Sequence, residues 1–457
     1  MVAAIATSYA GVQASLRDWN TPKTNMARAR FTSPLAESIA PDLEERFLRY
    51  VRIDTQSRRE RERSPSTPGQ LELARMLVSE LASFGLEDAA LDENGYVTAT
   101  LLGNGDRGRD GRERSATAAF GVLAHLDTSP DAPGAGVEPI VHRAYDGGVI
   151  ELPREGTRLD PATMPELLEK VGHDLVTASG DTLLGADDKA GVAEIMSAVS
   201  YLAAHPEIER PTFRVAFTPD EEIGEGASLF DIERFGAGCA YTLDGSTLGE
   251  LQDETFSAYE AIVTVTGVDV HPGQATGKLV NALRLAAQIV AGLPADTLTP
   301  ETTSGRTGFI HPFSLTGTAG QARIRLIVRD FDEALLESHV ELLREVAHRV
   351  VDAEPRARLD LDVRRQYRNM RQFLEDVPEV TAAAEEAIKA EGIDPIRVPI
   401  RGGTDGSRLS EMGLPTPNIF TGGHEYHSVR EWASIQDMAA AAATVVRLAE
   451  VWARRGK

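Results

Sequence analysis

Cysteine is almost absent from this sequence of 457 residues, in which Cys239 is the only one. A single cysteine excludes an internal disulfide framework and a cluster of thiolate metal ligands, and it is compatible with a reducing compartment. Long apolar runs are absent as well, since no segment reaches the roughly 18 apolar residues that a membrane span needs. The first residues, MVAAIA, lack the basic region and apolar core of a secretory signal, so we expect a cytoplasmic protein.

Positive charge is scarce, with 47 Lys and Arg against 70 Asp and Glu and a formal net charge of −23. This balance repels nucleic acids and anionic membrane surfaces and leaves cations, peptides and other small solutes as partners. Hydrophobic residues make up 42% of the chain, which is enough for a large core. The length favours two domains.

The pattern along the chain predicts a larger α/β domain that is interrupted by a smaller α+β module. Residues 1–40 show no clear periodicity, so we expect a flexible extension there. Strand-like and helical stretches then alternate in an order that places the larger domain at residues 41–256 and 369–457. A half-exposed strand pattern begins near residue 257, and the module built from it is expected at residues 257–368.

Three apolar runs that are typical of buried strands end in side chains able to bind metals. These side chains are His125 and Asp127 after the first run, Glu221 and Glu222 after the second, and Asp244 after the third. In open α/β sheets, ligands gather where strands end. Residues two apart in an extended chain point the same way, so Asp127 can accept a hydrogen bond from His125 and orient its ring. Taken singly, each group is more often a solvated surface pair or loop.

Asp187 and Asp188 stand between small residues at a turn that precedes a helical run, in the sequence GADDKAG. A carboxylate has two oxygens, so one Asp at this turn could bridge two metal ions. An Asp pair before a helix is more often an N-cap with a first-turn acid. The metal interpretation therefore depends on the other candidates, of which the last is His427, far away in the sequence.

Charge accounting tests a site for two divalent cations. Its five candidate ligands are His125, Asp187, Glu222, Asp244 and His427. Two neutral imidazoles and three carboxylates leave two such cations with one excess positive charge, which a bridging hydroxide cancels. Metal-bound water is acidified toward a pKa of about 7, so the nucleophile forms at neutral pH, and Glu221 is free to act as general base. Mixed nitrogen and oxygen ligands favour two Zn²⁺ ions, with Co²⁺ or Mn²⁺ as substitutes.

Five motifs resemble those of the M20 metallopeptidase family, and in particular its tripeptide aminopeptidases, from about Leu43 to the end of the chain. They are HLDTSPD at 125–131, GADDKAG at 185–191, TPDEEIG at 218–224, YTLDG at 241–245 and RGGTDG at 401–406. The resemblance implies an α/β zinc-peptidase catalytic domain with a mixed β-sheet flanked by helices. It also implies that the inserted α+β module is a lid or dimerisation domain.

The resemblance also implies roles for the metal-site residues. His125 and Asp244 would bind one zinc, and Glu222 and His427 the other. Asp187 would bridge the two zincs, with the peptide bond that follows it in the cis form, while Asp127 would orient His125 and Glu221 would be the general base. His424 stands where the family more often has an aromatic residue, so it competes with His427 as a ligand.

Three further residues are expected to bind substrate: His271, Asn281 and Arg401. The resemblance implies that His271 polarises the scissile carbonyl, reaching the site from a partner subunit or after domain closure. It implies that Arg401 contacts the carboxylate end of the substrate, although a structural ion pair is an equal alternative.

The sequence therefore predicts an aminopeptidase that releases the N-terminal residue from tripeptides, with no nucleic acid or membrane partner and with a homodimer left open. One alternative is another hydrolase of the same family, namely a dipeptidase, a carboxypeptidase or an N-acyl amino acid deacylase. The segments 128–131 and 401–406 favour the tripeptidase. A second alternative is a zinc-dependent peptide-binding protein without chemistry, against which the intact Asp127 and Glu221 argue.

Overall fold

The computed structural model describes residues 30–104 and 119–456. Its first helix, α2 (Pro34–Tyr50), begins inside the expected extension. Ser33 caps α2 by accepting a hydrogen bond from the N–H of Ala36 at 3.1 Å, and Pro34 occupies a position where a missing N–H costs nothing. The expected flexibility is therefore wrong for residues 34–40, because Ala36 and Ile39 are buried in the core. Residues 1–29 lie outside the described part of the chain.

A mixed eight-stranded sheet forms the centre of the larger part of the fold. Its strands, in spatial order, are β1 (Ala90–Leu91), β2 (Val97–Leu101), β8 (Phe213–Thr218), β3 (Phe120–His125), β9 (Ala240–Leu243), β16 (Asn418–Ile419), β10 (Glu250–Gln252) and β15 (Ile396–Arg397). The strands β8, β3 and β9 are parallel, with His125 paired to Thr218 and Leu123 paired to Thr242. Their carboxyl ends, after which the candidate ligands follow, thus meet at one edge of the sheet.

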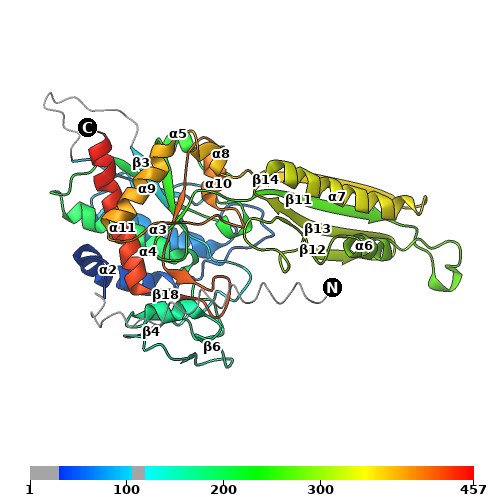
Figure 1. Cartoon of the computed structure of the whole chain (residues 1–457), viewed down its shortest axis with the longest axis horizontal. Helices are drawn as coiled ribbons and strands as arrows, with labels where there is room; N and C mark the ends of the chain where they lie inside the picture. The colour runs from blue at the N-terminus through cyan, green and yellow to red at the C-terminus, as the bar shows by residue number, and fades with distance from the viewer. Residues whose placement is uncertain (1–29, 105–118, 457) are drawn as a thin grey trace, which may run out of the picture. The chain divides into compact units, whose positions relative to one another are not determined.

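Helices cover both faces of this sheet, which explains why β3 reads as one continuous apolar run. The helices of one face are α2, α3 (Pro68–Ser83), α4 (Ala186–Ala204), α9 (Pro378–Ala390) and α11 (Ile435–Arg455), and α11 packs beside α4 and α9 (Figure 1). Phe120 and Val122 of β3 are buried with these helices, whereas Leu123 packs on the opposite face. Short helices contribute there, namely α5 (Ile232–Phe235) and α10 (Asp405–Glu411).

A second sheet has four antiparallel strands and a core of its own. In spatial order they are β12 (Phe309–Gly317), β13 (Gln321–Asp330), β11 (Ser257–Thr266) and β14 (Arg358–Tyr367), and the helices α6 (Ala282–Ala291) and α7 (Glu333–Asp352) pack against them (Figure 1). The strand β12 was not expected, because Pro312 interrupts its pattern. Proline is tolerated at this edge of the sheet, where the pairing with β13 shifts register between Pro312 and Ser314. The domain boundaries themselves stay a prediction.

A third sheet holds the loop that carries His427. Its strands, in order, are β17 (Gly423–His424), β18 (Trp432–Ser434), β7 (Leu175–Thr177) and β4 (Ile140–His142). The remaining elements are β5 (Ile150–Glu151), β6 (Arg158–Leu159), α8 (Arg371–Leu374) and the 3₁₀ turns η1 (Pro165–Lys170), η2 (Glu221–Ile223) and η3 (Pro272–Gln274). Among the helices of residues 30–104 and 119–456, none combines the length and apolar character that crossing a bilayer requires.

Candidate metal centre and active site

His125 closes β3 with its ring wholly inside the protein. Nδ1 lies 2.9 Å from the main-chain carbonyl oxygen of Asp127, which can only accept, so this nitrogen carries a proton. Nε2 then faces two carboxylate oxygens, at 2.8 Å from Asp187 and 3.8 Å from Asp244. A ring nitrogen surrounded by anionic acceptors is the arrangement that a metal ion, or a second proton, stabilises.

The carboxylate of Asp127 has a task beyond the expected one. It lies 3.4 Å from Nδ1 of His125, farther away than the main-chain carbonyl of the same residue. Its two oxygens also accept hydrogen bonds from the N–H groups of Glu221 and Glu222, at 2.9 and 3.2 Å. Asp127 therefore orients the histidine through its backbone and the two glutamates through its side chain.

Asp187 presents one oxygen to each of the two candidate imidazoles. Oδ1 lies 2.8 Å from Nε2 of His125, and Oδ2 lies 3.2 Å from Nε2 of His427. The peptide bond between Asp187 and Asp188 is cis, as the resemblance implied. The oxygens of Asp188 are close enough to the site to be ligands, but they accept hydrogen bonds from the N–H groups of His125 and Gly191 at 3.0 and 3.1 Å. Asp187 is thus the carboxylate whose two oxygens face the two imidazoles.

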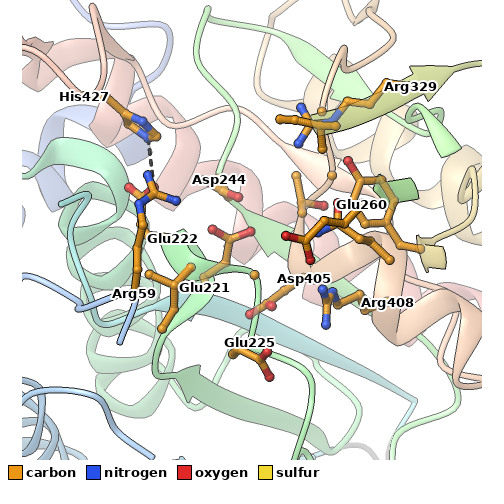
Figure 2. Close-up of a pocket in the computed structure, with 18 of the residues that line it drawn as sticks. Arg59, Glu221, Glu222, Glu225, Asp244, Glu260, Arg329, Asp405, Arg408 and His427 are labelled. Atoms are coloured by element: carbon orange, nitrogen blue, oxygen red, sulfur yellow. Dashed lines mark ion pairs between the residues drawn. The ribbon is translucent and has the colours of Figure 1, made fainter. Parts of the chain in front are cut away.

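His427 meets the same cluster from the loop between β17 and β18. Its Nε2 lies 3.0 Å from Oε2 of Glu222, and the two side chains face each other in Figure 2. Its other ring nitrogen, Nδ1, lies 3.4 Å from a carboxylate oxygen of Asp131. His424, the competing candidate, is buried with its ring stacked on Trp432 at 4.1 Å between centroids, and its Nδ1 faces Ser246 at 3.5 Å. The geometry favours His427.

The electrostatics of the cluster show that it lacks positive charge. Burial raises the pKa of Glu221 and of Asp244 well above the usual values, and neighbouring carboxylates add to the effect. Burial and the charge of Asp187 likewise raise the pKa of Glu222 to about 7. Burial lowers the pKa of His427, but hydrogen bonds to Asp187 and Glu222 outweigh it and bring the pKa to about 11. Protons held this tightly mark places where cations are stabilised.

The residues present fit a pair of divalent cations. Two groups of residues each offer three ligand atoms that lie within 4.8 Å of one another. One group is His125, Asp187 and Glu222, and the other is His125, Asp188 and Asp244. Oε1 of Glu222 is buried and has no hydrogen-bond partner among the described residues. Mixed imidazole and carboxylate donors suit zinc and its neighbours in the first transition series. A close approach of α4 to β9 assembles the set, since a Cβ on Gly191 would lie 2.1 Å from the carbonyl oxygen of Leu243.

A cavity of about 680 Å³ opens onto this cluster. Its lining includes Glu221, Glu222, Asp244 and His427, and Figure 2 shows Arg329, Arg408 and Glu260 across the cavity from them. Nε of Arg329 is buried without a hydrogen-bond partner in the described chain, and so is the hydroxyl of Tyr367. Gly403 of the RGGTDG motif makes room for that tyrosine, because a Cβ there would lie 2.3 Å from the ring. The cavity thus pairs a cation-binding side with cationic and hydroxyl donors.

The three expected substrate-binding residues do not line this cavity. The guanidinium of Arg401 donates to the carbonyl oxygens of Gly305 and Thr307, at 2.9 and 2.7 Å, and lies over the ring of Phe256. Asn281 caps α6 by accepting a hydrogen bond from the N–H of Arg284 at 3.0 Å. His271 is exposed and accepts a hydrogen bond from the N–H of Gly273. Arg401 and Asn281 have these structural partners, and the expected substrate-binding roles of Arg401, Asn281 and His271 stay predictions.

Two acids near the site, the exposed Asp131 and the buried Glu431, were not expected. Asp131 supports His427 as described above. Glu431 accepts hydrogen bonds from three N–H groups of the turn that carries Asp187. Glu431 does not stand out in the sequence, because an isolated carboxylate in a loop is typical of a solvated surface, whereas Asp131 closes the HLDTSPD motif.

Comparison with known proteins identifies the family. Residues 183–451 match the model of peptidase family M20/M25/M40. The chain belongs to this family. It is 46% identical to the peptidase T of Geobacillus kaustophilus over 415 residues, which cover 91% of this chain and 99% of the relative. The peptidase T of Bacillus subtilis is 46% identical over 407 residues, covering 89% and 97%. The M20 resemblance found in the motifs is confirmed.

Solved structures of M20 peptidases share the fold. The aminopeptidase PepT of Bacillus cereus aligns with a TM-score of 0.67 at 22% identity, covering 91% of this chain and 99% of the other. A tripeptidase of Staphylococcus aureus aligns with a TM-score of 0.70 at 19% identity and the same coverage. A dinuclear metal-binding M20 peptidase of Bacillus subtilis aligns with a TM-score of 0.59 at 16% identity, covering 91% and 98%. The expected mixed α/β architecture is confirmed.

Proposed function

We propose that the protein is a zinc-dependent aminopeptidase that hydrolyses the first peptide bond of tripeptides and releases the N-terminal residue. The observation that carries the proposal is the position of Asp187, whose two oxygens face His125 and His427, beside Glu221 in the lining of a cavity of about 680 Å³. Full-length relatives named peptidase T, at 46% identity, support the substrate class.

The proposed ligand set assigns His125 and Asp244 to one ion and Glu222 and His427 to the other, with Asp187 between them. Two divalent cations bound there supply Lewis-acid polarisation of the scissile carbonyl and lower the pKa of the attacking water. Zinc is the proposed metal, and Co²⁺ or Mn²⁺ are the proposed substitutes. The carboxylate of Asp127 accepts hydrogen bonds from the N–H groups of Glu221 and Glu222 and thereby fixes the position of the proposed base relative to a proposed ligand.

Glu221 is the proposed general base and acid. It takes a proton from the attacking water as the carbon–oxygen bond forms, and it delivers this proton to the leaving amine nitrogen as the carbon–nitrogen bond breaks. Burial raises the pKa of Glu221, which suits a group that must hold the proton between these two events. The products are a free amino acid and a dipeptide.

The far side of the cavity is proposed to bind the carboxylate end of the peptide. A guanidinium recognises a carboxylate through two parallel hydrogen bonds, and Arg329 has a buried Nε without a partner among the described residues. The unpartnered hydroxyl of Tyr367 offers a further donor. Such a fixed anion site at one end and the metal cluster at the other would select peptides by length.

The proposal also covers the cellular location and the partners of the enzyme. The single, buried Cys239 supports a reducing cytoplasmic location, and the net charge of −23 supports short peptides rather than nucleic acids as partners. A homodimer stays a prediction, together with the entry of His271 from a partner subunit.

A panel of peptides tests the substrate class. Purified zinc-loaded protein is incubated with free-amine di-, tri- and tetrapeptides and with an N-acetylated tripeptide, and the products are identified by mass spectrometry. Cleavage confined to free-amine tripeptides, with release of the first residue, is the expected result. Release of the last residue or of the acetyl group would instead identify a carboxypeptidase or a deacylase. Binding without any cleavage would identify a non-catalytic peptide-binding protein.

Replacing the base tests the assigned mechanism. Glu221→Gln should lower kcat on tripeptides by about 10²–10⁴-fold, because the amide cannot accept the proton of the water. Metal content, measured by atomic emission, should stay at two ions per chain. Glu233→Gln on the exposed helix α5 is the control and should leave both values unchanged. Near-normal kcat in Glu221→Gln would contradict the role.

A further inference from the structure

We propose that Glu431 is a positioning residue for the metal centre, which fixes the turn of Asp187 relative to the loop of His427. The inference rests on the two-metal site of the proposed function. It concerns a residue that would touch neither metal nor substrate and would act through the backbone of one ligand.

The carboxylate of Glu431 is saturated by one short stretch of backbone. The residue is 2% exposed. Its Oε2 accepts hydrogen bonds from the N–H groups of Leu184 and Gly185, at 2.7 and 2.8 Å, and its Oε1 accepts one from the N–H of Asp187 at 3.0 Å. All three donors belong to the residues that lead into α4. Hydrogen bonds to a charged acceptor are stronger than neutral ones, so this contact holds the turn firmly.

This turn needs an acceptor from elsewhere in the chain. The first N–H groups of a helix have no partners within it, and a Ser, Thr, Asp or Asn at the N-cap normally accepts one of them. The N-cap of α4 is Gly185, in the left-handed conformation at φ 83°, and it has no side chain that could accept. Asp187 is itself non-helical, at φ −87° and ψ 100°. Glu431 supplies the missing acceptor across 244 residues of sequence.

The same residue belongs to the loop that carries the second imidazole. Glu431 directly precedes β18 and donates its own N–H to the carbonyl oxygen of Ser428 at 3.3 Å, which closes the loop around His427. His427 lies in the left-handed region at φ 59°, so its position depends on the loop being held. One side chain therefore links the backbone of Asp187 to the loop of His427, whose Nε2 lies 3.2 Å from Asp187 Oδ2.

A buried cation balances part of this charge. Lys189, two residues beyond Asp187, is buried, and its Nζ donates to the carbonyl oxygen of Ile53 at 2.7 Å. Burial lowers the pKa of Lys189 to about 8, and the negative charges of Asp54, Glu431 and Asp127 oppose this shift. An isolated buried carboxylate would be costly, so the lysine helps to keep Glu431 in place.

Metal affinity separates positioning from a merely structural role. In Glu431→Gln the amide nitrogen replaces one oxygen and cannot accept an N–H, so the turn loses part of its support while the volume is kept. We expect one of the two Zn²⁺ ions to bind at least tenfold more weakly to the metal-depleted protein, measured by competition with a chromophoric chelator. The matched control is Glu391→Gln. Glu391 is also buried, at 1% exposure, but it lies away from the site, where its carboxylate accepts a hydrogen bond from Thr32. It should keep the wild-type affinity.

Hydrogen exchange gives a second readout that involves no metal. In the metal-free wild-type protein the amides of Leu184, Gly185 and Asp187 should exchange slowly, and in Glu431→Gln at least tenfold faster. Unchanged zinc affinity in Glu431→Gln would overturn the proposal. If that variant does not fold, rapid exchange of the three amides in the wild-type protein would overturn it instead. A wild-type protein that binds two ions but cleaves no peptide would refute the proposed function and leave this inference standing.

Discussion

Single side chains in the candidate metal centre are held by more contacts than their proposed ligand roles require. His125 is oriented by a main-chain carbonyl, and the carboxylate of Asp127 holds the backbone of the two glutamates. Asp188 fixes the backbone of His125, which frees Asp187 to point between the imidazoles. Rigid supports of this kind keep ligands in place when charge moves during a reaction.

Residue burial also predicts how the protein responds to acid. Burial lowers the pKa of His424 to about 4, and the charge of Lys170 adds to the effect. In the unfolded chain the same ring titrates near its usual pKa of about 6.5. Between these values the unfolded state binds a proton that the folded state does not, so the free energy of unfolding falls as the pH falls from 6.5 to 4. The single residue accounts for a loss of about 3 kcal/mol.

Replacement of the ring isolates this effect. His424→Phe keeps an aromatic ring to stack on Trp432 and removes the titrating group. Urea unfolding of metal-depleted wild-type and variant protein at pH 7 and at pH 4 should show the smaller loss of stability in the variant. Equal losses would mean that His424 is not the acid-sensitive group.

At the level of elements, the parallel strands β8, β3 and β9 bring the motifs together. Their carboxyl ends lie side by side in register, and the Gly191 contact draws the start of α4 against the end of β9. The apolar runs predicted these strands because burial on both faces leaves a plain sequence signal. The edge strand β12 left no such signal, since it contains Pro312 and is half exposed.

The role of Asn281 can be tested, because the residue was expected to bind substrate but caps a helix in the structure. Its side chain caps α6, so Asn281→Ala should lower the free energy of unfolding by about 1 kcal/mol, whereas Asn281→Asp keeps an acceptor and should have little effect. The KM for tripeptides should stay within about twofold of wild type in both variants. A large rise of KM in Asn281→Asp, with stability unchanged, would show that the amide contacts substrate after all.

For the molecule as a whole, the uncompensated acids predict that metal is part of its stability. Ions that bind only the folded form stabilise it by about 4 kcal/mol each at a thousandfold excess over Kd. Removal of metal with a chelator should therefore lower the thermal midpoint, and added zinc should restore it, as followed by scanning calorimetry. His427→Asn should respond less to zinc than the wild type, because one ligand is gone. Identical transitions with and without chelator in the wild type would argue against a two-metal centre.

The sequence by itself determined the family, the strands that end at the site and the identity of the side chains that converge there. These features are local, because a buried strand and the motif that follows it are read from consecutive residues. Only the tertiary structure decided which atoms meet: that His427 rather than His424 faces Asp187, that Arg401 is occupied by carbonyl groups, and that Glu431 supplies the acceptor that Gly185 lacks. Such pairings join residues 96 to 246 positions apart, and hydrogen-bond partners over that distance follow from how the elements pack and leave no pattern along the chain.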